Sequence, residues 1–477
     1  MMNAVLVIPV IFMAATPVRF ERHEIDKFPA GYQVAVADIN GDGRPDVIAL
    51  STEANRVDWY ENPTWKRRPV ARGPERGRES FPAKQKEAGG ARGPEKTPDP
   101  IERPIDLAVH DLDGDGKPEI ALASGFYFND ANRGGQIQWL KPRAGQGDRH
   151  LLCEASEGPF RQKEPVPFSA DVDEPWEVHP IAVDPVTHRL RWADLDGDGK
   201  KELVHAPIFG PGSQANIDPK PSHLWAFRVP KDPVKDPWPV WKIDETLTVL
   251  HGLCVVSSRT RIATEPSPPT PLPKGEGSYW RRDRLLTASY EGLSRFYPEG
   301  SGATLRFRKE FVSAGEKAVD QKPGASRGSS EIAYGRLSEE RPLVAAIEPW
   351  HGSEVVVYLT SSASTAPSPP APLPKGERSH QRLVLDNTLA EGHALVVADF
   401  DGDGQDEIVA GWRAGGGGLN LYKWTGGKSD SFRKTPLDRG IAAEGAVAAD
   451  INGDGRLDLV VIAGRTNNLV WYENKSK

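Results

Sequence analysis

A nine-residue acidic motif, Asp-x-[Asp/Asn]-Gly-Asp-Gly-x-x-[Asp/Glu], occurs five times in this sequence and constrains its fold more than any other feature. Each copy follows a short run of small and β-branched residues, and the spacing inside the motif does not change. The copies begin at Asp38, Asp111, Asp194, Asp399 and Asp450. This constant spacing indicates a repeat architecture, in which each repeat is one supersecondary unit that packs against its neighbours.

The motif also predicts a cation site. It places acidic or amide oxygens at positions 1, 3, 5 and 9, and its glycines permit left-handed turns. Calcium takes roughly six to eight oxygen ligands, so we expect about five structural calcium sites. Copies with Asn at position 3 carry one charge less and should bind calcium more weakly. The predicted ligands are Asp38, Asn40, Asp42, Asp46, Asp111, Asp113, Asp115, Glu119, Asp194, Asp196, Asp198, Glu202, Asp399, Asp401, Asp403, Glu407, Asp450, Asn452, Asp454 and Asp458.

Around each motif the sequence repeats a pattern of four short strands. A strand such as 34–37 leads into the acidic loop, a second such as 47–50 leaves it, and a third such as 57–60 ends in an aromatic residue. A stretch that ends in Ile-Asp or Leu-Asp, such as 241–244, precedes the next unit. Four strands per repeat is the content of one propeller blade.

Two further units, 251–297 and 332–359, keep the strand pattern without the acids, which brings the number of blades to seven. The stretch 20–26 resembles a fourth strand with no blade before it, while the last unit stops after its third strand. The sequence therefore predicts an all-β, seven-bladed β-propeller of four-stranded antiparallel blades, a single domain over residues 18–477. We expect the N-terminal strand to join the last blade and close the ring, which leaves no open sheet edge.

Three proline-rich or glycine-rich segments, near 71–100, 264–280 and 363–380, are predicted to be disordered inserts. Proline at this density cannot join a strand ladder. The apolar residues 1–17 are too short to span a bilayer and are predicted to be a signal peptide, with a buried strand as the alternative. Together with calcium sites suited to the millimolar calcium outside cells, they favour a secreted, periplasmic or cell-surface protein.

Composition excludes several other classes of protein. The net charge of −7 gives no electrostatic reason to expect nucleic acid as a partner. No other segment is long and apolar enough to span a membrane. The two cysteines, Cys153 and Cys254, allow one disulfide but exclude a disulfide scaffold or a thiolate metal site.

Alignment of the seven units on the first acid places one residue, six positions earlier, at the start of each innermost strand. In a propeller these strands line the axis, so their first side chains should ring the central channel at the end opposite the acidic loops. The turns between second and third strands reach the same end. The ring residues are Tyr32, Ile105, His188, His251, Ser330, His393 and Glu444, and the turns add Tyr290, Glu291, Trp350, His351, Trp412 and Arg413.

A lone histidine at a strand start is usually structural, but several ionisable groups around one axis indicate a ligand or metal that uses them. We expect His251, His351 and His393 to serve acid–base or metal-binding roles, with Glu291 as partner. Three histidines with an acid also predict an additional divalent metal in the funnel. Tryptophan stacks on sugars and arginine holds carboxylates or hydroxyls. The predicted substrate-binding residues are His188, Tyr290, Trp350, Trp412, Arg413 and Glu444.

On its five motifs the sequence resembles the FG-GAP/VCBS repeat proteins, over most of residues 20–474. The resemblance implies calcium-binding blades. Five stretches further resemble the propeller of the aldos-2-ulose (anhydrofructose) dehydratases, enzymes that eliminate water from keto-sugars. These stretches are 188–199, 251–252, 289–292, 349–352 and 391–393.

The narrower resemblance implies a carbohydrate dehydratase, a carbon–oxygen lyase whose base removes the proton next to a carbonyl. Those enzymes carry further cupin and lectin-like domains, so isomerase chemistry assigned to a cupin is not expected of this propeller. The alternative is a non-catalytic propeller that binds a glycan or a protein through the same face, since fold does not settle function.

Overall fold

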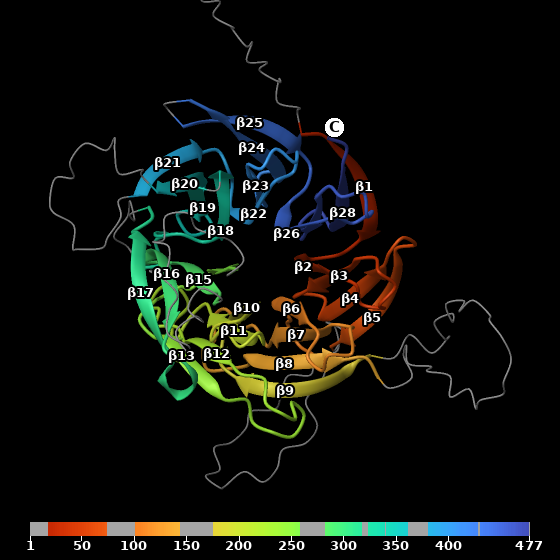
Figure 1. Cartoon of the computed structure of the whole chain (residues 1–477), viewed down its shortest axis with the longest axis vertical. Coiled ribbons are helices and arrows are strands. Elements are labelled where there is room, and N and C mark those ends of the chain that lie inside the picture. Colours follow the sequence, from red (N-terminus) through yellow and green to blue (C-terminus); the bar gives the residue numbers. More distant parts are fainter. Residues whose placement is uncertain are drawn as a thin grey trace, which may run out of the picture.

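The computed structural model describes residues 18–73, 101–143, 175–257, 282–316, 323–338, 340–360, 380–427 and 430–476. In these residues the chain forms seven four-stranded antiparallel sheets, arranged as blades around a central axis (Figure 1). The only helix of this part of the chain is the short 3-10 turn η2 (Gly302–Thr304). Over the same residues, the structure contains no helix of a length and hydropathy that would cross a membrane. The predicted fold class is confirmed.

Each of the first six blades consists of four strands that are consecutive in the chain. Blades 1 to 3 are β2 (Gly31–Ala37), β3 (Asp46–Ser51), β4 (Arg56–Glu61) and β5 (Lys66–Arg72); β6 (Asp106–His110), β7 (Glu119–Ser124), β8 (Gln136–Lys141) and β9 (Glu177–Val183); and β10 (Thr187–Ala193), β11 (Glu202–Pro207), β12 (Leu224–Phe227) and β13 (Val240–Asp244). Blades 4 to 6 are β14 (Gly252–Val256), β15 (Arg284–Ser289), β16 (Gly292–Glu299) and β17 (Arg306–Ser313); β18 (Ile332–Ser338), β19 (Arg341–Glu348), β20 (Glu354–Thr360) and β21 (His380–Asp386); and β22 (Gly392–Ala398), β23 (Glu407–Trp412), β24 (Gly418–Gly426) and β25 (Ser431–Asp438).

Blade 7 joins the two ends of the described chain. Its strands are β26 (Ala443–Ala449), β27 (Asp458–Ala463), β28 (Asn468–Asn474) and, outermost, β1 (Phe20–Lys27). β1 pairs with β28 from Phe20 opposite Asn474 to Lys27 opposite Asn468. The predicted closure of the ring by the N-terminal strand is therefore confirmed.

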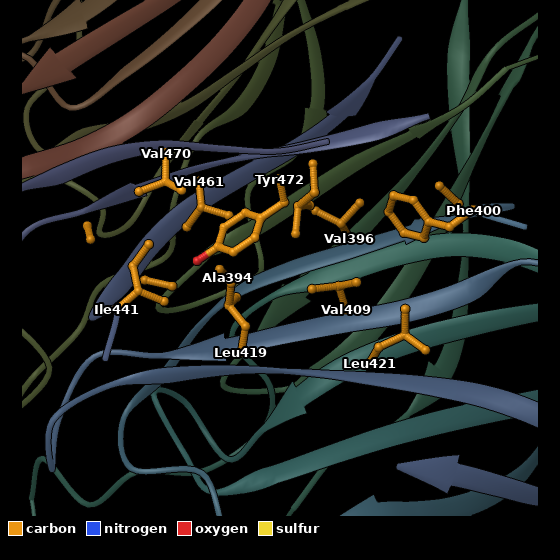
Figure 2. Close-up of a cluster of buried hydrophobic side chains, with 14 residues drawn as sticks. Ala394, Val396, Phe400, Val409, Leu419, Leu421, Ile441, Val461, Val470 and Tyr472 are labelled. Carbon is orange, nitrogen blue, oxygen red and sulfur yellow. The ribbon is translucent and has the colours of Figure 1, made fainter. Parts of the chain in front are cut away.

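The core lies mainly between neighbouring blades. Figure 2 shows one of these contacts, where apolar side chains of blade 6 interdigitate with those of blade 7. Val409 and Leu419 come from blade 6, Val461 and Val470 come from blade 7, and all four are at most 1% exposed. Strand alternation explains the pattern, because every second side chain of a blade faces the adjacent blade.

The two units that lack the acids are blades 4 and 5, as the repeat pattern predicted. The predicted inserts are shorter at two ends, because β5 runs on to Arg72 and β21 already begins at His380. The rest of these inserts, residues 1–17 and Cys153 lie outside the described residues. Cys254 is on β14 and has a free thiol.

Candidate functional site

In four blades the residue predicted to line the axis sits at a β-bulge. The register between the first and second strands shifts there, which leaves one residue of the innermost strand unpaired. A bulge re-aims a side chain relative to the regular alternation. The unpaired residues are Tyr32, His188, His393 and Glu444. Tyr32 contacts both histidines and His393 contacts Glu444, so the four side chains form one cluster. They come from innermost strands, which ring the axis in Figure 1.

Four histidines form the centre of the site. The ring centroid of His251 lies 4.5 Å from that of His188, 4.7 Å from that of His351 and 5.3 Å from that of His393. The Tyr32 hydroxyl is 3.2 Å from His188 Nε2 and 3.4 Å from His393 Nε2. A scatter of the imidazoles beyond about 10 Å would exclude a shared metal, since zinc–nitrogen bonds are about 2 Å long. The structure instead brings them together.

Burial keeps these imidazoles neutral. It lowers the pKa of all four histidines well below the usual value, and the positive charge of Arg189, of Arg413 or of both lowers it further. Neutral imidazole is the form that accepts a proton or binds a metal. Burial also raises the pKa of Tyr32 to about 12, so its hydroxyl stays protonated at neutral pH.

Neighbouring groups fix the tautomers of three of these histidines. His393 Nδ1 lies 2.6 Å from the carbonyl oxygen of Glu444 and must donate to it, which leaves Nε2 with the lone pair. Arg413 Nη2 lies 3.2 Å from His351 Nδ1 and can only donate, so the proton of neutral His351 is on Nε2. That Nε2 is 2.9 Å from His251 Nε2, which accepts its hydrogen bond.

The residues fit a divalent transition metal. His251, His351 and His393 each offer a nitrogen, and the three nitrogens lie within 4.8 Å of one another. His393 already has the arrangement typical of a metal-binding histidine, with its other nitrogen on a backbone carbonyl. The proton that His351 Nε2 shares with His251 stands where a cation would bind, so His351 would ligate through Nε2 only after losing that proton.

Sequence reasoning missed two residues beside the histidines. Glu331 Oε1 lies 3.1 Å from His251 Nδ1 and accepts a hydrogen bond of 2.8 Å from Arg189. Each of them directly follows a ring position, so strict alternation would turn it away from the channel. At Arg189 the bulge of β10 breaks that alternation. Both residues line an axial hollow of about 380 Å³, together with Asp106, His393 and Glu444.

Aromatic side chains form a wall beside the histidines. The Trp350 ring stacks on His351 at 4.5 Å, and Tyr290 packs against the edge of Trp350 at 5.8 Å, so these two predicted residues lie beside the histidines. Phe128 stacks on Trp350 with an angle of 5° between the rings, and Phe126 lies 5.8 Å from His188. The two phenylalanines belong to the β7–β8 loop, which carries no motif that could have revealed them.

An ion-pair network lies on the other side of the site. Arg413 donates 2.9 Å to Glu444 and 3.1 Å to Glu391, and Arg465 donates 2.7 Å to Glu391. Arg413 thus joins the histidines to a carboxylate at the mouth of the channel. Its predicted role in holding a ligand fits a guanidinium that is 17% exposed.

Two predicted residues have other partners among the described residues. The Glu291 carboxylate accepts hydrogen bonds from the backbone and hydroxyl of Thr248, at 2.8 and 2.6 Å. The Trp412 ring packs against the backbone of Gly418 and lies under the guanidinium of Arg439, at 5.8 Å. Neither is among the side chains that contact the histidines in the described part of the chain.

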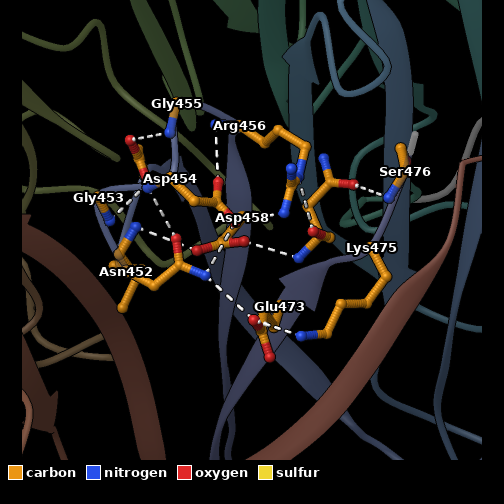
Figure 3. A network of polar contacts seen from close by, with 12 residues as sticks. Asn452, Gly453, Asp454, Gly455, Arg456, Asp458, Glu473, Lys475 and Ser476 are labelled. Atoms are coloured by element: carbon orange, nitrogen blue, oxygen red, sulfur yellow. Dashed lines mark hydrogen bonds and ion pairs between the residues drawn. The ribbon is translucent and has the colours of Figure 1, made fainter.

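The five acidic loops share one geometry at the opposite ends of the innermost strands. In the last copy the Asp450 carboxylate accepts hydrogen bonds from Gly453 and Gly455 at 2.9 and 2.8 Å (Figure 3). Both glycines have positive φ, +74° and +85°, as the motif predicted. Asp458, at position 9, is fully buried and accepts from the backbone of Ile451 and Asn474.

The ninth acid of every loop is buried close to the other carboxylates. Burial raises the pKa of Asp46, Glu119 and Glu407 to about 7 and that of Glu202 to about 8, and it raises the pKa of Asp458. A buried carboxylate that is difficult to ionise indicates that positive charge is missing. In chemical terms the loops therefore suit a hard cation such as calcium, except for 399–407, where the Lys423 ammonium group already lies 3.1 Å from Glu407.

Comparison with known proteins gives the same resemblance. Residues 30–57 match the FG-GAP repeat and residues 399–461 match the FG-GAP-like repeat. Aldos-2-ulose dehydratase of Phanerodontia chrysosporium is 23% identical over 304 residues, which cover 60% of this chain and 30% of that enzyme.

Two solved structures, provisionally assigned as 6-phosphogluconolactonases, come from Bacteroides uniformis and Bacteroides fragilis. Their sequences are 11% and 12% identical to this chain, and the TM-scores are 0.43 and 0.44. Each match covers 94% of this chain, and the matches cover 95% and 94% of the two solved chains. The present chain is a seven-bladed β-propeller that contains FG-GAP repeats and resembles the aldos-2-ulose dehydratases.

Proposed function

We propose that this protein is an exported, calcium-stabilised propeller that eliminates water from a keto-sugar at the histidine cluster. The observation that carries the proposal is the set of neutral imidazoles around His251, enclosed between an aromatic wall and the Arg413 ion pairs. The similarity to a named dehydratase supports the reaction class, although the matched region spans less than a third of that enzyme.

His251, His351 and His393 would hold a divalent metal, which when bound would supply Lewis-acid stabilisation of an enolate oxygen. His188 is outside this trio, and its buried Nδ1 has no hydrogen-bond partner among the described residues. We therefore assign His188 as the general base. Arg413 offers donors to the oxygens of a sugar, while Trp350, which is 7% exposed and stacked on His351 and Phe128, closes the wall beside it.

The reaction proceeds by proton transfer at His188. The imidazole takes the proton from the carbon next to the carbonyl, and the electron pair moves onto the carbonyl oxygen. Arg413, which can donate but not accept, stabilises that negative oxygen. When the enolate collapses, the bond to the β-hydroxyl breaks and a carbon–carbon double bond forms. The hydroxyl takes the proton back from His188 and leaves as water.

The test is incubation of the purified protein with anhydrofructose or an osone, with and without added zinc or manganese. We expect an enone absorbance that grows with time, and its rate should fall by about 100-fold or more in His188→Gln. His179→Gln is the matched control, because His179 stacks on Trp139 of blade 2 at 4.3 Å, away from the channel. Absence of the enone with wild-type protein under all metal conditions would refute the proposal.

A second candidate function is glycan binding without catalysis. A pocket of about 370 Å³ lies between the first and last acidic loops and is lined by Trp65, Trp471 and Arg44. The two indole rings are 5.9 Å apart, and such rings are suitable platforms for sugars. Binding of a glycan that Trp471→Ala abolishes and His188→Gln leaves unchanged would favour this function.

A further inference from the structure

The acidic loops differ in the residue that approaches them from the third strand of the blade. In all five blades the residue directly after the ninth acid of the motif pairs with a residue of the third strand, in the same register. The residue that approaches the loop comes directly after this third-strand partner. It is an acid where motif position 3 is Asn, and a lysine or arginine where position 3 is Asp. In chain order it is Glu61, Lys141, Arg228, Lys423 and Glu473.

The contacts explain this correlation of charge. Lys141 forms an ion pair with Asp113, and Arg228 lies 3.8 Å from Asp196. In the last loop the pairing is reversed, since the amide of Asn452 donates 3.1 Å to Glu473 (Figure 3). In each of these blades the side chain at the third loop position is therefore complementary to the side chain that approaches it from the third strand.

Lys423 of blade 6 has the strongest form of this contact. Its ammonium group forms an ion pair with Asp401, lies 2.8 Å from Asp403 and lies 3.1 Å from Glu407. The lysine is only 5% exposed. Three donors on the ammonium meet three carboxylates, so this buried charge is fully paired.

These carboxylates stand at positions 3, 5 and 9 of the motif, the same groups that a calcium ion would need. The remaining acid, Asp399, already accepts from the backbone of Asp403 and Gly404 at 3.1 and 2.9 Å. A calcium ion could enter only if the ammonium left. The loop 399–407 thus does not fit the cation that its motif implies.

We propose that Lys423 is the resident cation of the loop 399–407, and that this blade takes up no calcium. The calcium requirement of the ring then falls on the other loops. It falls most on 38–46 and 450–458, where no lysine or arginine stands at the corresponding third-strand position. These two loops lie in blades 1 and 7, on either side of the ring closure, and Asn62 links them by a 2.7 Å hydrogen bond to the carbonyl of Ile451. The two loops with Asn at position 3 should then bind calcium more tightly than the loops with Asp there, which is the reverse of the order expected from the Asn residues alone.

The first test counts calcium ions per chain by equilibrium dialysis and atomic emission. Wild-type protein should bind at most four, and Lys423→Met should bind one more. Lys434→Met is the matched control. Lys434 also forms an ion pair, with Asp386 at 2.5 Å, but Asp386 belongs to none of the five acidic loops. Five ions in the wild type, with no gain in Lys423→Met, would overturn the proposal.

A second measurement needs no variant and so does not depend on how Lys423→Met folds. Lysines of the wild-type protein are acetylated under native conditions, in EDTA or in millimolar calcium, and the modified sites are read by mass spectrometry. Lys423 should be equally protected in both conditions, while the exposed Lys235 reacts quickly. Faster acetylation of Lys423 in calcium would mean that the ion displaces the ammonium, and would refute the inference. Neither test depends on the activity of the channel.

Discussion

Buried histidines are the residues whose charge this fold controls most strongly. Four of them line the channel, and a fifth, His205, lies inside blade 3. Its side chain is fully buried, and Nε2 lies 2.9 Å from the Thr187 hydroxyl. Burial lowers the pKa of His205 to about 3. Because His205 lies inside blade 3 and not in the histidine cluster of the channel, its effect on stability can be measured separately.

His205 should make the propeller sensitive to acid. Between about pH 6.5 and pH 3 the unfolded chain binds a proton at this residue and the folded chain does not. Its contribution to stability is therefore complete above pH 6.5 and is lost as the pH falls. Over this range the free energy of unfolding falls by up to about 1.4 kcal/mol per pH unit. In urea unfolding, His205→Gln should show a shallower loss of stability between pH 6.5 and 5 than the wild type. Between pH 7.5 and 8.5, where histidine is neutral in both states, the two slopes should coincide; equal slopes in the acid range would contradict this account.

At the scale of the strand, outer-strand acids connect neighbouring blades. The Tyr422 hydroxyl on β24 of blade 6 donates 2.5 Å to Asp386 at the end of β21 in blade 5. Equivalent bonds of 2.6 and 2.7 Å join Tyr472 to Asp438 and Tyr60 to Asp26. The last of these bonds runs from blade 1 to β1 of blade 7, so the same contact holds the strand that closes the ring against blade 1.

Loss of one such contact should cost a measurable part of the folding free energy. Hydrogen bonds to a charged group contribute about 1.5–3 kcal/mol, so Tyr422→Phe should lower the free energy of unfolding by that amount. A double-mutant cycle with Asp386→Asn separates the pair from its surroundings. The two substitutions should be clearly less destabilising together than the sum of their separate effects, whereas simple additivity would show that the blades are not coupled here.

The strands themselves could be predicted from the sequence, because each blade repeats a local pattern around a motif of fixed spacing. The Ile/Leu-Asp ending marked outer strands such as 241–244 correctly. The tyrosines that bond to Asp26, Asp386 and Asp438 lie in the next blade, however, and no local pattern reveals them. The ring of His188, His251 and His393 was predictable from alignment alone. Glu331 and Arg189 were not; at Arg189 a bulge overrides the alternation that sequence reasoning relies on. Glu291 was predicted as a partner of the histidines, yet its carboxylate bonds to Thr248.

At the scale of the whole molecule, stability depends on a ring that contains both ends of the described chain. The outermost strand β1 is held to β28 by a ladder that covers Phe20 to Lys27. The Phe20 ring also packs edge-on against Phe400 of blade 6, at 5.4 Å between centroids. Without β1, blade 7 would have three strands and β28 would present an open edge, which favours association between chains.

Removal of residues 1–27 should therefore lower the unfolding temperature and cause the protein to associate, as seen by light scattering during heating. The open edge of β28 should also accept the missing strand in trans, because main-chain hydrogen bonds supply most of the affinity in strand addition. A synthetic peptide with the sequence of residues 18–28 should restore the unfolding temperature in a concentration-dependent manner, as expected for a ligand of the folded state. A scrambled peptide of the same composition is the control, since it retains the charge but not the register that places Phe20 against Phe400. If the shortened chain unfolds at the same temperature as the full one, or if both peptides act alike, β1 does not hold the ring closed.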